Sequence, residues 1–146
     1  MITTIWTDKT KSFPAIDATS RSINKWFRIH EIAPSRIWAV GECALLNGCL
    51  QLENTQGYNL EVVIGIAVST QPLVGTLEAP PFVHPLVGAN VDFNEHYGER
   101  QVFFGWTSRA ATRHYFGLYA RCKTNAISGV QSRVVNVNNG YLQVML

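Results

Sequence analysis

The stretch Arg113–Lys123, which reads Arg-His-Tyr-Phe-Gly-Leu-Tyr-Ala-Arg-Cys-Lys, decides the fold class. Successive side chains of a strand point to opposite faces, so these residues separate into two sets. One set is apolar apart from a histidine: His114, Phe116, Leu118, Ala120 and Cys122. The other set is aromatic and basic: Arg113, Tyr115, Gly117, Tyr119, Arg121 and Lys123. The pattern predicts a central strand of an antiparallel sandwich, with one packed face and one wetter face.

Further strands are predicted on both sides of this stretch, and turn signals separate them. The strands are expected at residues 36–46, 49–54, 60–69, 100–107, 130–137 and 141–146, with a short edge strand near 73–77. Asn47-Gly48 and Asn138-Asn139-Gly140 predict tight turns, because Asn and Gly accept the positive φ that such turns need. Residues 22–32 fit a strand or a helix, and their aromatic and β-branched content favours the strand.

About eight strands and no amphipathic helix predict an all-β sandwich or barrel. Residues 71–99 are rich in proline and glycine, so we expect a long excursion there. Residues 22–146 form the predicted domain, and residues 1–21 show no periodicity and are expected to be an irregular N-terminal arm. The arm either follows the surface or docks on a partner, with Trp6 and Phe13 as its anchors.

The composition limits the classes of protein to which this chain can belong. Of the 146 residues, 47% are hydrophobic and 15% are charged, whereas soluble domains average about 25% charged residues. A chain with so few charged residues is expected to hide part of its surface from water, and we predict that it does so by oligomerisation. Twelve Lys and Arg against ten Asp and Glu are too balanced for a nucleic-acid binder. No secretory signal and no run of ~20 apolar residues is present, so we expect no membrane partner and reduced cysteines.

Two segments are candidate contact surfaces. Residues 60–69 are apolar on both faces, which predicts either a strand covered on both sides or an intersubunit face. The aromatic-basic set of the central strand could stack sugars or pair with a subunit. The low overall charge favours the subunit interface, with four contact residues: Arg113, Tyr115, Tyr119 and Arg121.

No residue set predicts catalysis, a metal site or a cofactor. The segment from His84 to Glu99 holds two histidines and several carboxylates, but their spacing matches no metal-ligand frame. The four histidines are scattered, which does not suit an enzyme on a cupin-like scaffold. Glu42 lies among apolar residues, so we expect it to pair with an arginine from a neighbouring strand or subunit.

Three segments carry a resemblance to a known group of proteins. They are Trp26–Glu42 (WFRIHEIAPSRIWAVGE), His114–Cys122 (HYFGLYARC) and Gly140–Leu146 (GYLQVML). The pattern over residues 22–146 resembles jelly-roll, TNF-like β-sandwich proteins of tailed bacteriophage virions, including capsid decoration (cement) proteins. The long excursion at 71–99 departs from that pattern and leaves the attachment surface open.

The resemblance implies a non-enzymatic homotrimer on the outer capsid surface of a virion. Its partners would be its own copies and the major capsid protein, and it would be made in the host cytoplasm without a signal peptide. Trp6, Phe13 and the apolar strand at 60–69 would supply the contacts. The alternative is a receptor- or carbohydrate-binding head domain of a tail fibre or spike, which would use Tyr115, Tyr119 and the loop 82–99.

Overall fold

The chain is all-β in the parts that its computed structural model describes. These parts are residues 2–6, 11–16, 26–34, 36–53, 60–73, 75–77, 87–91, 97–122 and 133–146. The backbone alone is described for residues 11–16, 60–61, 76–77, 87–91, 97, 122 and 133–135. The described residues form ten strands and no helix. Among them, accordingly, no helix has the length and apolar character needed to cross a membrane.

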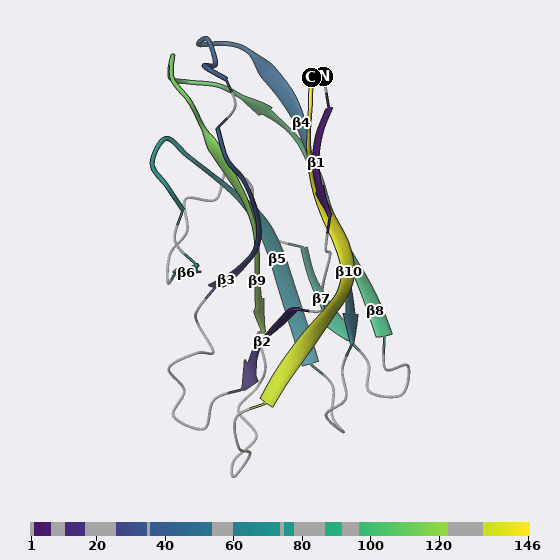
Figure 1. Cartoon of the computed structure of the whole chain (residues 1–146). Coiled ribbons are helices and arrows are strands. Elements are labelled where there is room, and N and C mark those ends of the chain that lie inside the picture. The colour runs from purple at the N-terminus through teal and green to yellow at the C-terminus, as the bar shows by residue number, and fades with distance from the viewer. Residues whose placement is uncertain are drawn as a thin grey trace.

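Two antiparallel sheets pack face to face as a sandwich (Figure 1). Sheet A has the order β1-β10-β4-β8, and β2 pairs with the other half of β10. Its strands are β1 (Ile2–Trp6), β2 (Lys11–Ile16), β4 (Cys43–Glu53), β8 (Tyr97–Thr107) and β10 (Arg133–Met145). Sheet B has the order β6-β3-β9-β5-β7. Its strands are β3 (Trp26–Ile32), β5 (Leu60–Ser69), β6 (Thr76–Leu77), β7 (Val87–Val91) and β9 (Tyr115–Cys122).

The connections make this sandwich a jelly roll. The chain crosses between the sheets at each step from β3 to β4 to β5, and again from β7 to β8, β9 and β10. At these steps consecutive strands lie in opposite sheets, as in the double-sheet jelly roll. β9 lies between β3 and β5, so the prediction of a central strand there is confirmed. The termini lie side by side (Figure 1).

The core between the sheets follows the alternation of the strands. Phe116, Leu118 and Ala120 of β9 are buried in it, as their shared face predicted. Four side chains of β5 point into the same core: Val62, Ile64, Ile66 and Val68. β4, β8 and β10 supply the opposite layer: Ala44, Leu46, Leu50, Leu52, Val102, Phe104, Trp106, Val137, Leu142 and Val144.

The outer face of sheet B carries a second, smaller core, which corrects the expectation of a wetter face. It consists of Trp26, Val63, Ala67, Leu73 and Tyr119. The segment after β5 folds back over the sheet: Gly75 O accepts a 2.9 Å bond from the Arg28 backbone N–H, and Leu73 O accepts a 2.6 Å bond from the Arg28 side chain. The strand at 60–69 is thus covered on both faces by its own chain, so it is not an intersubunit or capsid contact.

The first 21 residues were expected to be irregular, and this is wrong for β1 and β2. Both strands pair with β10, β1 along residues 141–145 and β2 along residues 133–137. Their own periodicity is weak because each lies at an edge of the sheet and depends on the long β10 for its hydrogen bonds. β7 was also missed, because it lies in the proline-rich excursion, where it pairs with β5.

Both Asn-Gly turn predictions are wrong as well. Asn47 and Gly48 lie inside β4, which is paired on both sides along its length, with β10 and β8. Asn139 and Gly140 lie inside β10, and the signal there marks a register shift between Val137 and Asn139. Such a bulge accommodates one extra residue without ending the strand. Residues 36–42 precede β4 and are not a strand.

Candidate interaction surfaces

The outer face of sheet A carries an uncharged area that four of the described strands form together. Residues paired across β1, β10, β4 and β8 point to the same side of the sheet. Toward the far end of β4 this outer side carries two carboxylates, Glu53 and Glu99. Over the rows that β1 spans, together with the row of Cys43 and Thr107, the outward side chains are uncharged: Ile2, Thr4, Trp6, Cys43, Leu45, Asn47, Cys49, Gln101, Phe103, Thr107, Tyr141, Gln143 and Met145. We call this surface the A face.

Four large apolar side chains of the A face are exposed. They are Ile2 at 63%, Trp6 at 57%, Leu45 at 46% and Phe103 at 56%. The Trp6 ring meets the Tyr141 ring edge to face at 5.3 Å between centroids. Exposed apolar groups are ordinary when scattered, but a cluster on one flat face marks an interaction site.

A row of polar side chains crosses the A face between the apolar ones. Gln101 Nε2 donates to Asn47 Oδ1 at 3.0 Å, and Asn47 Nδ2 donates to Gln143 Oε1 at 3.0 Å. Gln143 Nε2 in turn donates to Thr4 Oγ1 at 3.3 Å. We call these four residues the amide ladder. Its polar groups bond to one another, so covering the A face would desolvate them at a lower cost than it would unpaired groups.

The residues predicted as contacts lie in different places. Trp6 belongs to the A face and not to a free arm, and the side chain of Phe13 lies outside the described residues. On sheet B, Arg113 is exposed and Tyr115 is half-buried. Arg121 is half-buried, and its guanidinium lies 4.9 Å from the centroid of the Trp26 ring. These three residues remain predicted interface contacts.

Tyr119 is covered within its own chain, so it is not a subunit contact. It has no exposed surface and packs in the smaller core. Burial raises the pKa of its phenol to about 12. Residues 71–73 and 75, which we call the strap, lie over sheet B, where Leu73 packs on Tyr119 and Gly75 bonds to β3. The face of β9 that was expected to stack sugars or pair with a subunit is therefore in large part internal.

An aromatic cluster closes one end of the sandwich, and the sequence did not predict it. The Trp106 ring lies 5.1 Å from Trp38, 5.0 Å from His114 and 5.3 Å from Phe116 between centroids, each edge to face. His114 Nδ1 donates to Thr112 O at 3.2 Å, since a carbonyl only accepts. The Trp38 backbone N–H also donates to Thr112 O, at 2.8 Å, so the two end loops are joined.

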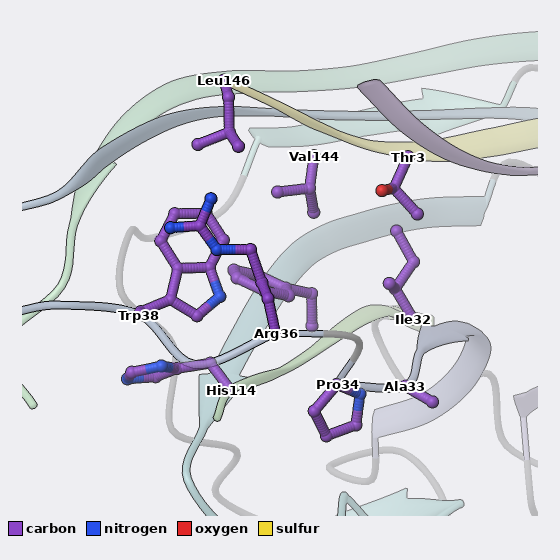
Figure 2. A pocket seen from close by; sticks show the side chains of 10 residues that line it. Thr3, Ile32, Ala33, Pro34, Arg36, Trp38, His114, Val144 and Leu146 are labelled. Carbon is purple, nitrogen blue, oxygen red and sulfur yellow. The ribbon is translucent and has the colours of Figure 1, made fainter. Parts of the chain in front are cut away.

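The pocket beside this cluster is too small for a substrate (Figure 2). Arg36 stacks on the Trp38 ring with its guanidinium carbon 4.3 Å from the centroid. Val144 and Leu146 line the other side. Its volume of about 20 Å³ is that of roughly one water molecule, whereas ligand sites hold hundreds of cubic ångströms.

A larger, polar cleft lies at the same end of the sandwich, and His114 lines both it and the small pocket. It has a volume of about 760 Å³ and runs between the end of β5 and the loop after β8. Three residues bring hydroxyl groups to the cleft: Ser69, Thr70 and Thr107. Among the described lining residues, Arg109 has the one side chain that is always charged. Hydroxyl and guanidinium donors suit a polar or anionic ligand such as a sugar.

Glu42 is paired, as predicted, but with an arginine from its own loop. The Arg36 guanidinium bonds to Glu42 Oε2, and the Ala39 backbone N–H donates to Oε1 at 2.7 Å. Both bonds lower the pKa of the Glu42 carboxyl, and the bond from the Ala39 backbone N–H has the larger effect. The pair joins residues 36 and 42 of the loop before β4, which is a structural role.

No group of three or more His, Cys, Asp or Glu side chains that could hold a metal is found in the described part of the chain. Of the candidate metal segment from His84 to Glu99, residues 84–86 and 92–96 lie outside the described residues, and 87–91 and 97 are described by their backbone, so Glu99 is its one His or carboxylate side chain that the structure places. Cys43 is exposed and Cys49 is buried, and neither is in a disulfide. A scan against protein-family models and a search of curated proteins both found no match.

Proposed function

We propose that this chain is a non-enzymatic structural protein that self-associates through the A face. The single observation that carries the proposal is an uncharged four-strand surface with four exposed large apolar side chains. At about 4.8 Å per strand and ~3.3 Å per residue, the rows from Ile2 to Trp6 cover roughly 300 Å² in projection. A patch of about this size is the largest that a typical monomer exposes, and such a patch is often functional.

The kind of partner follows from the absence of charge on the A face. A partner with a basic or acidic surface would lose the hydration of its charges over these uncharged rows, and the nearest carboxylate, Glu99 beside Cys49, lies only at their border. A second copy presents the same uncharged surface, so its desolvation is inexpensive and its apolar groups contribute about 25 cal/mol per Å² buried. A chain with 15% charged residues is consistent with such an assembly.

Within this function, we propose that the assembly is a homotrimer that decorates the head of a tailed bacteriophage. The jelly-roll connectivity and the sequence resemblance support this reading. The capsid would be contacted by surfaces that the trimer leaves exposed, because the A face is used between subunits. Trp6 then acts between subunits. Deleting residues 1–21 would remove two strands of sheet A, so point substitutions are the appropriate test.

The mass of the untagged protein in solution tests self-association, measured by light scattering on a size-exclusion column. We expect a mass near three chains. Phe103→Asp places a charge on the A face and should release folded monomers. Val40→Asp is the matched control, because Val40 is 66% exposed and lies off this face, and it should keep the wild-type mass. A monomeric wild-type protein would overturn the proposal.

Capsid decoration is tested separately with phage heads that lack the protein. The trimer should bind them with a saturable stoichiometry, and the Phe103→Asp monomer should bind more weakly because it loses avidity. Binding of heads that is no stronger than binding of an unrelated jelly roll would remove the decoration role and leave the self-association intact.

The polar cleft favours a second candidate, a receptor- or carbohydrate-binding head domain. Arg109 and the hydroxyls of Ser69, Thr70 and Thr107 replace the predicted site, since Tyr119 is buried. A glycan array with wild-type protein and Arg109→Ala tests it. Hits that disappear in the variant would support this function, and an array without hits above background would count against it.

A further inference from the structure

The amide ladder has a direction. Each of its three hydrogen bonds is donated toward β1: from Gln101 on β8 to Asn47 on β4, then to Gln143 on β10, and last to Thr4 on β1. Asn47, in the middle, is 8% exposed and also lies 3.4 Å from the Tyr141 hydroxyl. The ladder therefore crosses the whole sheet from one edge strand to the other.

The direction leaves opposite hydrogen-bonding groups at the two ends. At the β1 end the Thr4 hydroxyl accepts from Gln143, so its own proton remains to be donated. At the β8 end Gln101 donates through Nε2, so its carbonyl oxygen remains an acceptor. Within the described chain, neither of these two groups has a side-chain partner. One end is a donor and the other an acceptor.

We propose that the amide ladder sets the register of a head-to-tail assembly, in which the Thr4 hydroxyl of one copy donates to the Gln101 carbonyl oxygen of the next. This inference rests on the proposed self-association through the A face. Three ladders joined in this way close a polar ring, with apolar rows on both sides of it. The apolar rows supply affinity, and the ring admits one alignment, since any other leaves the Thr4 hydroxyl and the Gln101 carbonyl oxygen covered and unpaired.

The geometry distinguishes this arrangement from a twofold pair. Contacts around a ring of three are heterologous, so different ends meet, whereas a twofold pair repeats each contact in both directions. A fully bonded polar layer within an apolar surface is the arrangement that selects register and oligomer state in coiled coils, at some cost in stability. The ladder would have the same role on a sheet.

The test traps the two ends with cysteines. In a Cys43→Ser background, which removes the exposed thiol of Cys43, Thr4→Cys and Gln101→Cys are combined, and the protein is treated at low concentration with a short bismaleimide cross-linker. Head-to-tail closure predicts a covalent trimer on a denaturing gel, because the linker bridges two thiols at the ends that the proposed hydrogen bond brings together, whereas a disulfide would need Cα atoms within about 7 Å. Each single-cysteine variant should run as one chain. A covalent dimer, or cross-linking of a single variant, would overturn the inference.

A second variant tests the ladder without new thiols. Asn47→Leu keeps the side-chain volume and breaks both central bonds, so the folded protein should lose its single mass and give at least two oligomeric species. Gln51→Leu, on the same side of β4 but outside the ladder, should keep the wild-type mass. If wild type is a trimer and Asn47→Leu is indistinguishable from it, the ladder has no register role, although the proposed self-association would stand. A monomeric wild type would instead remove both.

Discussion

Replacing Gly140 with alanine tests the strand pairing at the centre of sheet A. A Cβ atom at this position would overlap the carbonyl oxygen of Cys49 and would lie 3.2 Å from the Leu50 Cα. Cβ contacts under 3.0 Å are essentially never seen, and the obstacle here is backbone. β10 would have to move away from β4, although the two are hydrogen-bonded along both strands.

The expected loss is about 3 kcal/mol. Overpacking a core costs about 1–3 kcal/mol, and a rigid obstacle places Gly140→Ala at the upper end of that range. For a chain of this size, 3 kcal/mol lowers Tm by roughly 10 °C.

Two other glycines give a graded control. At Gly48 the nearest atom is Leu118 Cδ1 at 2.7 Å, the end of a flexible side chain, so Gly48→Ala should cost less than Gly140→Ala. At Gly105 nothing lies within 4 Å, so Gly105→Ala should be neutral or stabilise by up to about 1 kcal/mol. The unfolding free energies are compared by urea titration with tryptophan fluorescence, at one protomer concentration because association contributes to stability.

The result also separates a strand from the turn that the Asn-Gly signal predicts. In a turn with positive φ, Gly140→Asn would be better tolerated than Gly140→Ala, because asparagine accepts that conformation. In the observed strand, asparagine is larger than alanine and should destabilise more. Gly140→Ala within about 0.5 kcal/mol of wild type, a value typical of surface substitutions, would refute the pairing described here.

Three further predictions concern other parts of the sandwich. Leu73→Ala should destabilise the protein by about 2 kcal/mol or more in urea titrations, because it empties the smaller core over sheet B. Cys43→Ser should remove the fast-reacting thiol at pH 8, whereas Cys49→Ser should not, because burial, with Glu99 nearby, raises the pKa of Cys49 to about 11. Glu42 has a pKa below 4.5 in the folded state, so its contribution is present above that pH and is lost as the pH falls through the folded pKa. The stability difference between wild type and Glu42→Gln should therefore shrink below pH 4.5, and a difference that grows on acidification would contradict the pairing with Ala39 and Arg36.

The strands that could be predicted are those whose alternation records a buried face. β5 lies at the predicted residues, and β9 and β8 overlap theirs, because a sheet that packs on one side requires an apolar residue at every second position. The packed face of β9 was predicted correctly for the same reason. Its opposite face was not, because the residues that cover Tyr119 come from β3, β5 and Leu73 of the strap, none of them adjacent to it in sequence.

The turn signals failed where two neighbouring strands outweigh a local preference. Asn47 and Gly48 favour a hairpin turn in isolation, yet β4 is paired along its length with β8 and β10. Gly48 is needed there because Leu118 and Val102 approach too closely for a side chain. Glycine at this position reflects close packing in the core and not a positive φ, which Gly41 alone has among the described glycines.

The sequence alone determined the class of this protein: it is lightly charged and all-β, and at least one of its strands is apolar on both faces. Only the tertiary structure determined which residues form the A face, the surface that we propose for self-association. The amide ladder joins residues 4, 47, 101 and 143, which no local pattern connects. Alternation with period two determines which side of a strand is buried, whereas the register between strands distant in sequence determines which side chains meet. That register is set by the packing of the whole sandwich.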